Sequence, residues 1–146
     1  MPAPQPGDPI RWRMHLAVPP ERVFTALDSD DGRAAFWAEA AIERNDVVHF
    51  RFINGQRCEA KIVSRRAPHE WTIEYFGALA QFVLAADGAG GTDLTLTQAG
   101  VPGHEWHEVH AGWLNVLFPL KAWLVHGVDL RNHDPSRTWD HGYADQ

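Results

Sequence analysis

The spacing of hydrophobic residues along the chain alternates between two periods, and each period predicts one type of element. Apolar and polar residues alternate over residues 10–18, which predicts a half-buried β-strand that ends at Pro19 and Pro20. Two short helices are expected next, with Pro20 tolerated at the start of the first. From residue 39 the period returns to two. This region predicts antiparallel strands near residues 40–45, 46–53, 56–66, 70–76, 79–86 and 92–98.

The longest helical pattern in the chain follows these strands, over residues 101–129. Its apolar residues recur at steps of three and four, so they share one face. They are Val109, Trp113, Val116, Leu117, Leu120 and Leu124. Pro119 lies inside the pattern and is expected to kink the helix, either as a bend that follows a curved sheet or as a hinge that opens a pocket. The strands offer this helix a surface to cover, so the space between helix and sheet is where a functional site is expected.

A second apolar stripe and the two ends of the chain complete the pattern. The stripe consists of Trp106, Leu114, Phe118 and Val125, and it needs cover from the C-terminal tail or from another subunit, which leaves a homodimer open. Residues 1–9 are rich in proline and are expected to form a flexible leader, so residues 10–127 are expected to be a single domain. The tail, residues 128–146, is polar but contains Trp139 and Tyr143. These either anchor the tail on the body or belong to a disordered end.

Composition and charge narrow the class of protein. A chain of 146 residues with 45% apolar residues is long enough for one domain with a core. The formal net charge of -6 argues against a general affinity for nucleic acid or for anionic membranes. Cys58 is the single cysteine and fits a reducing compartment. No stretch has the pattern of a signal peptide or of a membrane span, so a cytoplasmic protein is expected.

Several short segments occur in an order that matches a known family. They are the run from Val18 to Phe24, Phe36-Trp37, the turn from Ala67 to Trp71, the strand from Gly90 to Thr97, and Gly112-Trp113. In this order, over residues 10–127, the chain resembles the START-like (SRPBCC) helix-grip superfamily. Within that superfamily it is similar to the bacterial homologues of the activator of heat-shock protein 90 ATPase.

The resemblance implies an α+β helix-grip fold, START-like and birch-pollen-allergen-like. In that fold a curved antiparallel β-sheet of about six to seven strands wraps round a long C-terminal helix, with two short helices after strand one and a cavity between sheet and helix. The resemblance does not imply one activity, because members bind lipids, hormones or aromatic ligands and some catalyse cyclisation. The co-chaperone function of the eukaryotic relatives transfers poorly, since this chain is a single small domain.

The Asn54-Gly55 pair gives an expected register for the hairpin over residues 46–66. Both residues accept the positive φ of a two-residue turn, which would pair Ile53 with Gln56. One face of the hairpin then carries Val47, His49, Arg51, Ile53, Gln56, Cys58, Ala60 and Ile62. The other carries Val48, Phe50, Phe52, Arg57, Glu59 and Lys61. The second face has clustered charges that are costly to bury, so the first is expected to line the cavity.

This register points His49 and Arg51 into the cavity. Arg51 would then either anchor a carboxylated ligand or end in solvent at the rim. If the register slips by one residue, Phe50 and Phe52 become the pocket floor instead. Other expected ligand contacts are mostly aromatic, although each is also a normal core residue: Trp12, Trp37, Trp71, Tyr75, Phe82, Trp113 and, on the helix, Leu117. Together they would form an apolar pocket with a few polar points.

Patterns that would indicate other chemistry are weak. His104, His107 and His110 stand at steps of three, which is not the metalloprotease spacing, and a solvated helix start is expected rather than a metal site. Cys58 lacks an activating pattern and is expected to be a small buried residue. No phosphate loop or dinucleotide fingerprint occurs. The sequence therefore predicts no metal, no cofactor and no assigned catalytic residue.

Three hypotheses about function remain from the sequence. The first is binding of a small hydrophobic ligand in the cavity between the sheet and the long helix, with a carboxylate on the ligand if Arg51 anchors it. The second is an enzyme of the cyclase or hydratase type that uses His49 or Tyr75 as acid or base in the same cavity. The third is a co-chaperone-like interaction module that uses the second stripe of the long helix.

Overall fold

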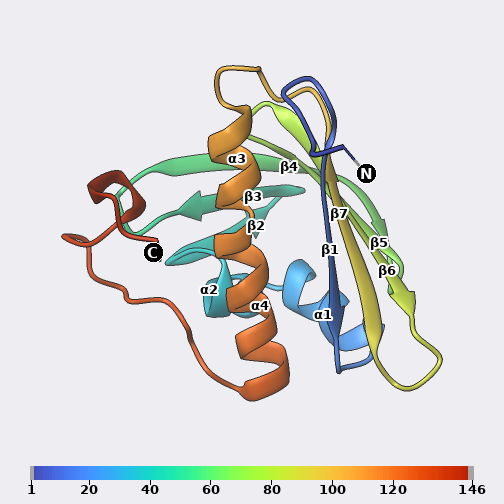
Figure 1. Ribbon diagram of the computed structural model, residues 1–146. Helices are drawn as coiled ribbons and strands as arrows, with labels where there is room; N and C mark the ends of the chain where they lie inside the picture. The colour runs from blue at the N-terminus through green and yellow to red at the C-terminus, as the bar shows by residue number, and fades with distance from the viewer. Residues whose placement is uncertain (1, 145–146) are drawn as a thin grey trace.

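A computed structural model describes residues 2–144 of the chain, and it has the predicted α+β architecture (Figure 1). The elements are β1 (Ile10–Leu16), α1 (Pro20–Asp28), α2 (Asp30–Phe36), β2 (Ala40–Arg44), β3 (Val47–Arg51), β4 (Arg57–Arg66), β5 (Glu70–Tyr75), β6 (Ala78–Ala86), β7 (Thr92–Gln98), α3 (Trp106–Gly112), α4 (Leu114–His126) and a short 3-10 helix, η1 (Trp139–His141). The strands match the predicted ones to within about two residues at each end, a normal uncertainty for boundaries.

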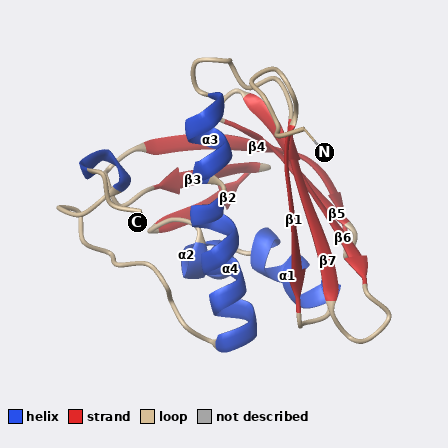
Figure 2. Ribbon diagram, viewed as in Figure 1, coloured by secondary structure: helices blue, strands red, loops and turns tan. Residues whose placement is uncertain are grey.

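The strands form one seven-stranded antiparallel sheet in the order β1-β7-β6-β5-β4-β3-β2. In Figures 1 and 2 the sheet curves around the α3–α4 helix, and α1 and α2 close one end of the space between them. The first strand joins the last, with Trp12 opposite Leu96. This closure explains why a helix that follows β7 can lie against the concave face of the whole sheet.

The core lies between the concave face and the helix. Along β6 and β7 buried residues alternate with exposed or half-exposed ones, as a sheet with one solvated face requires. Phe82, Leu84, Leu94 and Leu96 are essentially unexposed there. The predicted inner face of the long helix is confirmed, because Trp113, Val116, Leu117, Leu120 and Leu124 are all buried and Val109 packs against the same cluster.

The long helix has an interruption that the sequence did not predict. It divides at Trp113 into α3 and α4, while Pro119 lies buried inside α4. Just before the division, the indole nitrogen of Trp12 donates a hydrogen bond to the backbone oxygen of His110 at 2.9 Å. A side chain that takes a helix carbonyl is a normal cause of local irregularity. The division at Trp113 was not predicted, and the kink expected at Pro119, which lies inside the continuous α4, stays a prediction.

The predicted hairpin register is wrong by one residue. Phe50 lies opposite Cys58 and Val48 opposite Ala60, and all four are buried. The connection has three residues rather than two, since the backbone of Phe52 bonds that of Gln56 and only Gly55 has a positive φ, 85°. The strand β4 faces as predicted, with Cys58, Ala60 and Ile62 inward. The strand β3 faces the opposite way, so Phe50 points inward, and Phe52, just after the strand, lines the cleft described below.

The C-terminal tail is docked on the body through a buried arginine. Arg131 donates hydrogen bonds to the backbone oxygens of Ala38 at 2.9 Å and Ala34 at 2.7 Å, and pairs with Asp129 at 3.1 Å. Beyond it, His133 contacts both Glu39 and Asp129 at 2.6 Å. The side chain of Trp139 then reaches Glu108 on α3 at 3.2 Å. The tail is therefore anchored on the body through Trp139, which is one of the two alternatives left open by the sequence.

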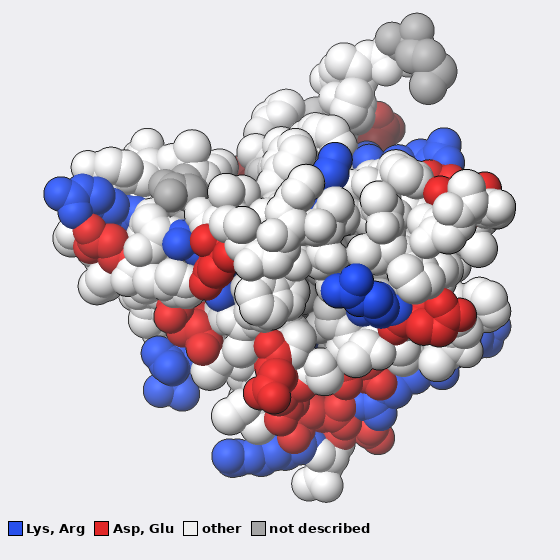
Figure 3. Space-filling view, turned by 90° about the horizontal axis from the view of Figure 1, so that it is seen from below, with Lys and Arg blue, Asp and Glu red and all other residues white. Residues whose placement is uncertain are grey.

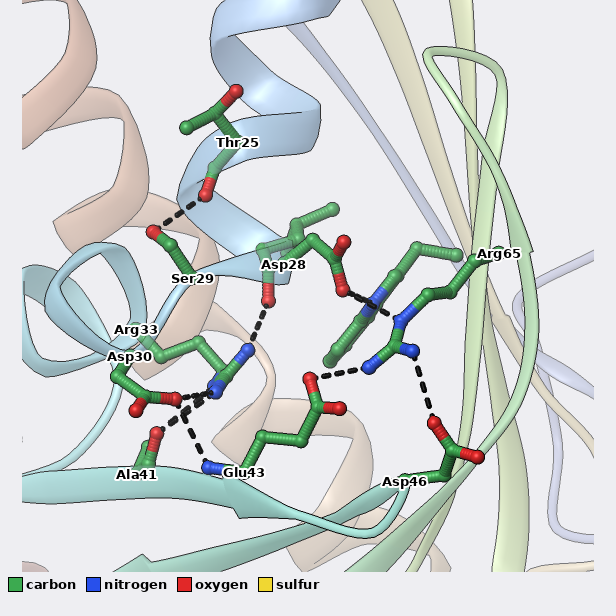
Figure 4. Close-up of polar contacts among 11 residues, drawn as sticks. Thr25, Asp28, Ser29, Asp30, Arg33, Ala41, Glu43, Asp46 and Arg65 are labelled. Carbon is green, nitrogen blue, oxygen red and sulfur yellow. Dashed lines mark hydrogen bonds and ion pairs between the residues drawn. The ribbon is translucent and has the colours of Figure 1, made fainter.

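A polar cluster joins α1 and α2 to the far end of the sheet (Figure 4). The guanidinium of Arg33 is fully buried and donates to the backbone oxygens of Leu27 and Ala41 and to the carboxylate of Asp30. Burial lowers the pKa of this guanidinium, although Asp30 opposes the effect. Next to it, Arg65 pairs with three carboxylates, those of Asp28, Glu43 and Asp46. These contacts hold the helices in place and do not reach the cleft described below.

Two further features of the structure concern its surface charge and the length of its helices. In the view of Figure 3, basic side chains lie beside acidic ones over this face rather than in a separate basic patch. In the part of the chain that the structure describes, no helix has the length and apolar character needed to cross a bilayer.

Candidate functional site

A cleft of about 380 Å³ opens between one end of the sheet and the helix α3. Its volume falls within the range of small-molecule sites. The walls come from the tip of the β3–β4 hairpin, the β5–β6 turn, the loop after β7, the facing side of α3 and the start of α4, and η1 of the tail. The lining residues are Phe52, Ile53, Asn54, Gln56, Tyr75, Phe76, Ala78, Gln98, Val101, Pro102, Glu105, Glu108, Val109, Gly112, Trp113, Asn115, Val116, Thr138, Trp139 and Asp140.

Aromatic rings form much of the wall, and the core beneath holds them in place. Tyr75 and Trp113 lie with ring centroids 5.2 Å apart, and Trp37 underlies both, at 5.4 and 6.0 Å. On the hairpin side, Phe52 stacks between Phe50 and Phe76. Because these rings pack against neighbouring rings, the core holds this part of the cleft wall in place.

A buried glutamine links three walls of the cleft. The side-chain oxygen of Gln98 accepts a hydrogen bond from the indole of Trp113 at 2.9 Å. Its side-chain nitrogen donates to the backbone oxygens of Tyr75, at 3.0 Å, and Ala78, at 3.4 Å. Gln98 is only 2% exposed, so these bonds satisfy polar groups that would otherwise be costly to bury. Its role is to orient Trp113 against the β5–β6 turn.

The hydroxyl of Tyr75 is held as a neutral phenol. It accepts a hydrogen bond from the indole nitrogen of Trp37 at 3.1 Å. Burial raises the pKa of Tyr75 well above its usual value, and the bond from Trp37 opposes this only in part. A phenol with a raised pKa keeps its proton at neutral pH, so Tyr75 is unsuited to act as a general base.

Acidic groups supply the charge of the cleft. Glu105, Glu108 and Asp140 line it, and the lining residues include no lysine, arginine or histidine. Glu108 accepts a hydrogen bond from the indole of Trp139, and Asp140 accepts one from the side-chain amide of Asn54 at 2.7 Å. Glu105 has the imidazole of His104 at 3.6 Å. The tail therefore closes one side of the cleft through two hydrogen bonds, and the donor of each is an uncharged group.

Two of the predicted ligand-contact residues, Tyr75 and Trp113, line the cleft. Trp37, Trp71, Phe82 and Leu117 are fully buried core residues beneath it. Trp12 packs at another place, where its ring lies 4.5 Å from that of His110. Sequence reasoning identified the aromatic core correctly as a group but could not separate the rings that face the cleft from those that support it.

The structure does not bring His49 and Arg51 to the cleft. Both lie on the outer face of the hairpin, opposite Glu59 and Arg57, and 42% of the His49 side chain is exposed. The prediction that these two residues point into the cavity is therefore wrong. The cause is the one-residue shift of β3, because such a shift moves every side chain of a strand to the other face. The structure instead has the alternative register, in which Phe52 forms part of the pocket wall.

Several lining residues were missed. Glu105, Glu108 and Gln98 were not predicted to line the cleft. Phe52 could have been found from the sequence, because the alternative register of the hairpin places it in the pocket. For Asp140 there was no signal, because its contact with Asn54 joins positions 86 residues apart.

The histidines on α3 are structural or exposed. The ring of His110 stacks against Trp106 at 4.7 Å and against Trp12, and burial lowers its pKa. Trp106 belongs to the second apolar stripe, which was expected to need cover from the tail or from another subunit. It is buried, and its indole donates to the backbone oxygen of Asp8 in the leader. Among residues 2–144 no group of histidine, cysteine, aspartate and glutamate side chains is arranged to hold a metal ion.

The geometry matches solved structures closely. Matches include a protein of Staphylococcus saprophyticus (TM-score 0.74, 21% identity, covering 85% of this chain and 96% of that one). They also include the Aha1 dimer of Colwellia psychrerythraea (TM-score 0.72, 21% identity, 82% and 98%) and an AHSA1-like protein of Aeromonas hydrophila (TM-score 0.68, 17% identity, 80% and 91%). The fold is that of the Aha1-like proteins. Protein-family models and curated proteins give no match.

The helix-grip fold predicted from the resemblance is thereby confirmed. The two matches cover 85% and 82% of this chain, whose seven strands form one antiparallel sheet. Identities near 20% establish the fold and carry no residue roles from those proteins to this one.

Proposed function

We propose that this protein binds a small hydrophobic molecule in the cleft between the end of the sheet and α3. The observation that carries the proposal is the cleft itself, about 380 Å³ in volume and walled by Phe52, Tyr75, Phe76, Trp113 and Trp139. A preformed concave site with several aromatic walls and few polar groups is the usual form of a small-molecule site. The Aha1-like fold, which encloses the space between sheet and helix, is compatible with this role.

Binding is favoured over catalysis because only one of the two proposed catalytic groups lines the cleft. His49 lies on the outer face of the hairpin, and burial raises the pKa of Tyr75, so its phenol gives up its proton less readily than an ordinary tyrosine. The carboxylated ligand considered from the sequence also loses its support, since Arg51 does not line the cleft. A neutral or cationic molecule suits the walls better. The buried thiol Cys58 fits a reducing compartment, so we place this binding function in the cytoplasm.

A variant that fills the cleft tests the proposal. Gly112 lines the cleft, has no positive φ, and a Cβ added there meets nothing within 4 Å. Gly112→Leu should therefore project a side chain into the cleft without lowering stability, since leucine also favours a helix over glycine by about 0.5–1 kcal/mol. Gly103→Leu is the matched control, because its Cβ is equally unhindered and Gly103 does not line the cleft.

The measurement is native mass spectrometry of the three proteins purified from the same cells, followed by denaturing extraction. We expect a small molecule on the unmodified protein and on Gly103→Leu, and none on Gly112→Leu. If all three are empty, titration with naphthylmethanol decides, and failure of the unmodified protein to bind it would overturn the proposal. Equal loading of Gly112→Leu would overturn it too.

A second candidate function, self-association, is favoured by the outer side of α4. Phe118 is 51% exposed and Trp123 is 40% exposed, and Leu130 of the tail, which is 53% exposed, lines an apolar groove together with Phe118. Exposed apolar side chains in a row are typical of an interaction surface, and one structural relative is described as a dimer. We expect a dimer by light scattering that Phe118→Asp disrupts and that Leu79→Asp, on the outer face of the sheet, leaves intact. A monomeric unmodified protein at high concentration would contradict this role.

A further inference from the structure

We propose that the ligand of the cleft is a cation: an apolar body that contains a ring and carries a protonated amine. This inference rests on the proposed binding function and specifies the class of ligand. It follows from the pairing, in one concave site, of aromatic faces with carboxylates and from the lack of basic lining residues.

The first argument is the sign of the charge. Glu105 is the N-cap residue of α3, Glu108 lies in the first turn of that helix, and Asp140 of the tail lines the same cleft. The hydrogen bonds that Glu108 and Asp140 accept come from the neutral donors Trp139 and Asn54. Neutral donors leave the formal charge of a carboxylate in place, so the potential inside the cleft is negative.

The second argument is the nature of the walls. Aromatic faces attract cations through the ring quadrupole, and the attraction adds to the ordinary burial of apolar surface. Trp113 and Tyr75 form one wall, and Trp139 closes the cleft while it donates its indole proton to Glu108. A ring next to a carboxylate is the arrangement that recognises an ammonium group on an apolar body.

The third argument is what the cleft would reject. A carboxylate or phosphate placed there would have no basic lining residue as a partner, and burying an unpaired charge is costly. The arginines closest in sequence to the hairpin tip, Arg51 and Arg57, face each other on its outer side. His104 contacts Glu105 at 3.6 Å and is itself exposed, so its charge would be screened by solvent. An anionic ligand is therefore expected to bind most weakly, and a neutral ligand is expected to have an affinity between those of the anion and the cation.

A series of three ligands with the same ring separates charge from shape. Naphthylmethylamine, naphthylmethanol and naphthoic acid are titrated against the full chain by calorimetry at neutral pH, where the first is cationic, the second neutral and the third anionic. We expect the amine to bind roughly fivefold tighter than the alcohol, since one exposed cation–ring or ion-pair contact contributes about 1 kcal/mol, and the acid to bind most weakly. Added salt should reduce the advantage of the amine.

Variants then assign the preference to the cleft. Glu108→Gln keeps an oxygen that can accept from Trp139 but removes the charge, so the affinity ratio of amine to alcohol should fall towards one. The control Glu21→Gln removes an exposed carboxylate of α1 that does not line the cleft and should leave the ratio unchanged. An unchanged ratio in Glu108→Gln would overturn the inference.

The outcomes distinguish the two levels of the argument. If the alcohol binds, and the acid binds as tightly as the amine or more tightly, the proposal of a cationic ligand is overturned. The proposed binding function would still stand. Absence of binding by all three would overturn both. Tighter binding of the amine that disappears in Gly112→Leu and weakens in Glu108→Gln would support both.

Discussion

The side-chain amide of Asn54 lies 2.7 Å from a carboxylate oxygen of Asp140, so the tip of the β3–β4 hairpin and the C-terminal tail meet beside the cleft. Trp139, the preceding residue of the tail, reaches across to Glu108 on α3. The tail thus joins the sheet to the helix at the open side of the site. The shape of the cleft depends on a segment outside the part of the chain that resembles the helix-grip superfamily.

Removal of the arginine that holds the tail should release it. Arg131 is 8% exposed and donates to the backbone oxygens of Ala34 and Ala38. In Arg131→Leu these donors are lost, so residues 128–144 should exchange amide hydrogens much faster while the sheet stays protected. Hydrogen–deuterium exchange with mass spectrometry measures this. Arg137→Leu is the control, since the Arg137 side chain is 60% exposed and its partners Asp134 and Tyr143 both lie within the tail. Fast exchange in the control as well would mean that Arg131 is not the anchor.

The docking of the tail should weaken as the pH rises. The pKa of His133 is raised, mainly by its hydrogen bond to Asp129 and further by Glu39, with burial opposing the shift. The folded tail therefore favours the protonated imidazole, and this contribution is present below the unperturbed value of 6.5 and is lost as the pH rises through the higher folded pKa. The indole signal of Trp139 in proton–nitrogen correlation spectra should shift with this titration. In His133→Gln the signal should no longer follow it, and a persistent shift there would assign the effect elsewhere.

The two arginines of the polar cluster should differ in their importance for stability. Arg33 is fully buried, and its loss in Arg33→Met leaves the backbone oxygens of Leu27 and Ala41 without a donor, at a cost of about 1–3 kcal/mol each. Arg65 is 32% exposed, so its ion pairs are screened, and Arg65→Met should cost about 1 kcal/mol. Urea unfolding gives both free energies. If Arg65→Met lowered the free energy of unfolding more than Arg33→Met, burial would not be the factor that decides the importance of these arginines.

The register of β3 predicts that two neighbouring residues differ in their effect on ligand affinity. Phe52 lines the cleft, so Phe52→Ala should weaken binding of naphthylmethanol about tenfold, which corresponds to about 1.4 kcal/mol of lost apolar contact. Arg51 lies outside the cleft, so Arg51→Ala should bind as the unmodified protein does. Calorimetric titration compares the three proteins. The reverse pattern would return β3 to the register expected from the sequence.

The fold was predictable because its signals are local and repeated. Alternation along β1, β6 and β7 fixes which side chains face the core, and steps of three and four place Trp113, Leu117 and Leu120 on the inner face of the helix. The charges of Arg57, Glu59 and Lys61 also identified the outer face of β4 correctly. Each of these conclusions rests on many residues that agree with one another.

The site was less predictable because single contacts decide it. One additional residue in the hairpin loop, Ile53, reverses the facing of β3, and the short segment Val47–Arg51 has apolar residues on both faces to accept either register. The tail contacts join positions 31 to 97 residues apart, such as Trp139 with Glu108 and Arg131 with Ala34. Residues at such distances carry no pattern that one sequence reveals.

The measurement that tests the central claim most directly uses the tryptophans as reporters of position. Trp113 and Trp139 line the cleft, whereas Trp106 is buried near the leader and Trp123 lies on the outer side of α4. Proton–nitrogen correlation spectra are recorded while naphthylmethanol is added. A ligand in the cleft predicts that the indole signals of Trp113 and Trp139 shift together and saturate while those of Trp106 and Trp123 stay fixed. Shifts confined to Trp123, or no saturable shift at all, would contradict the proposal that this cleft is the binding site.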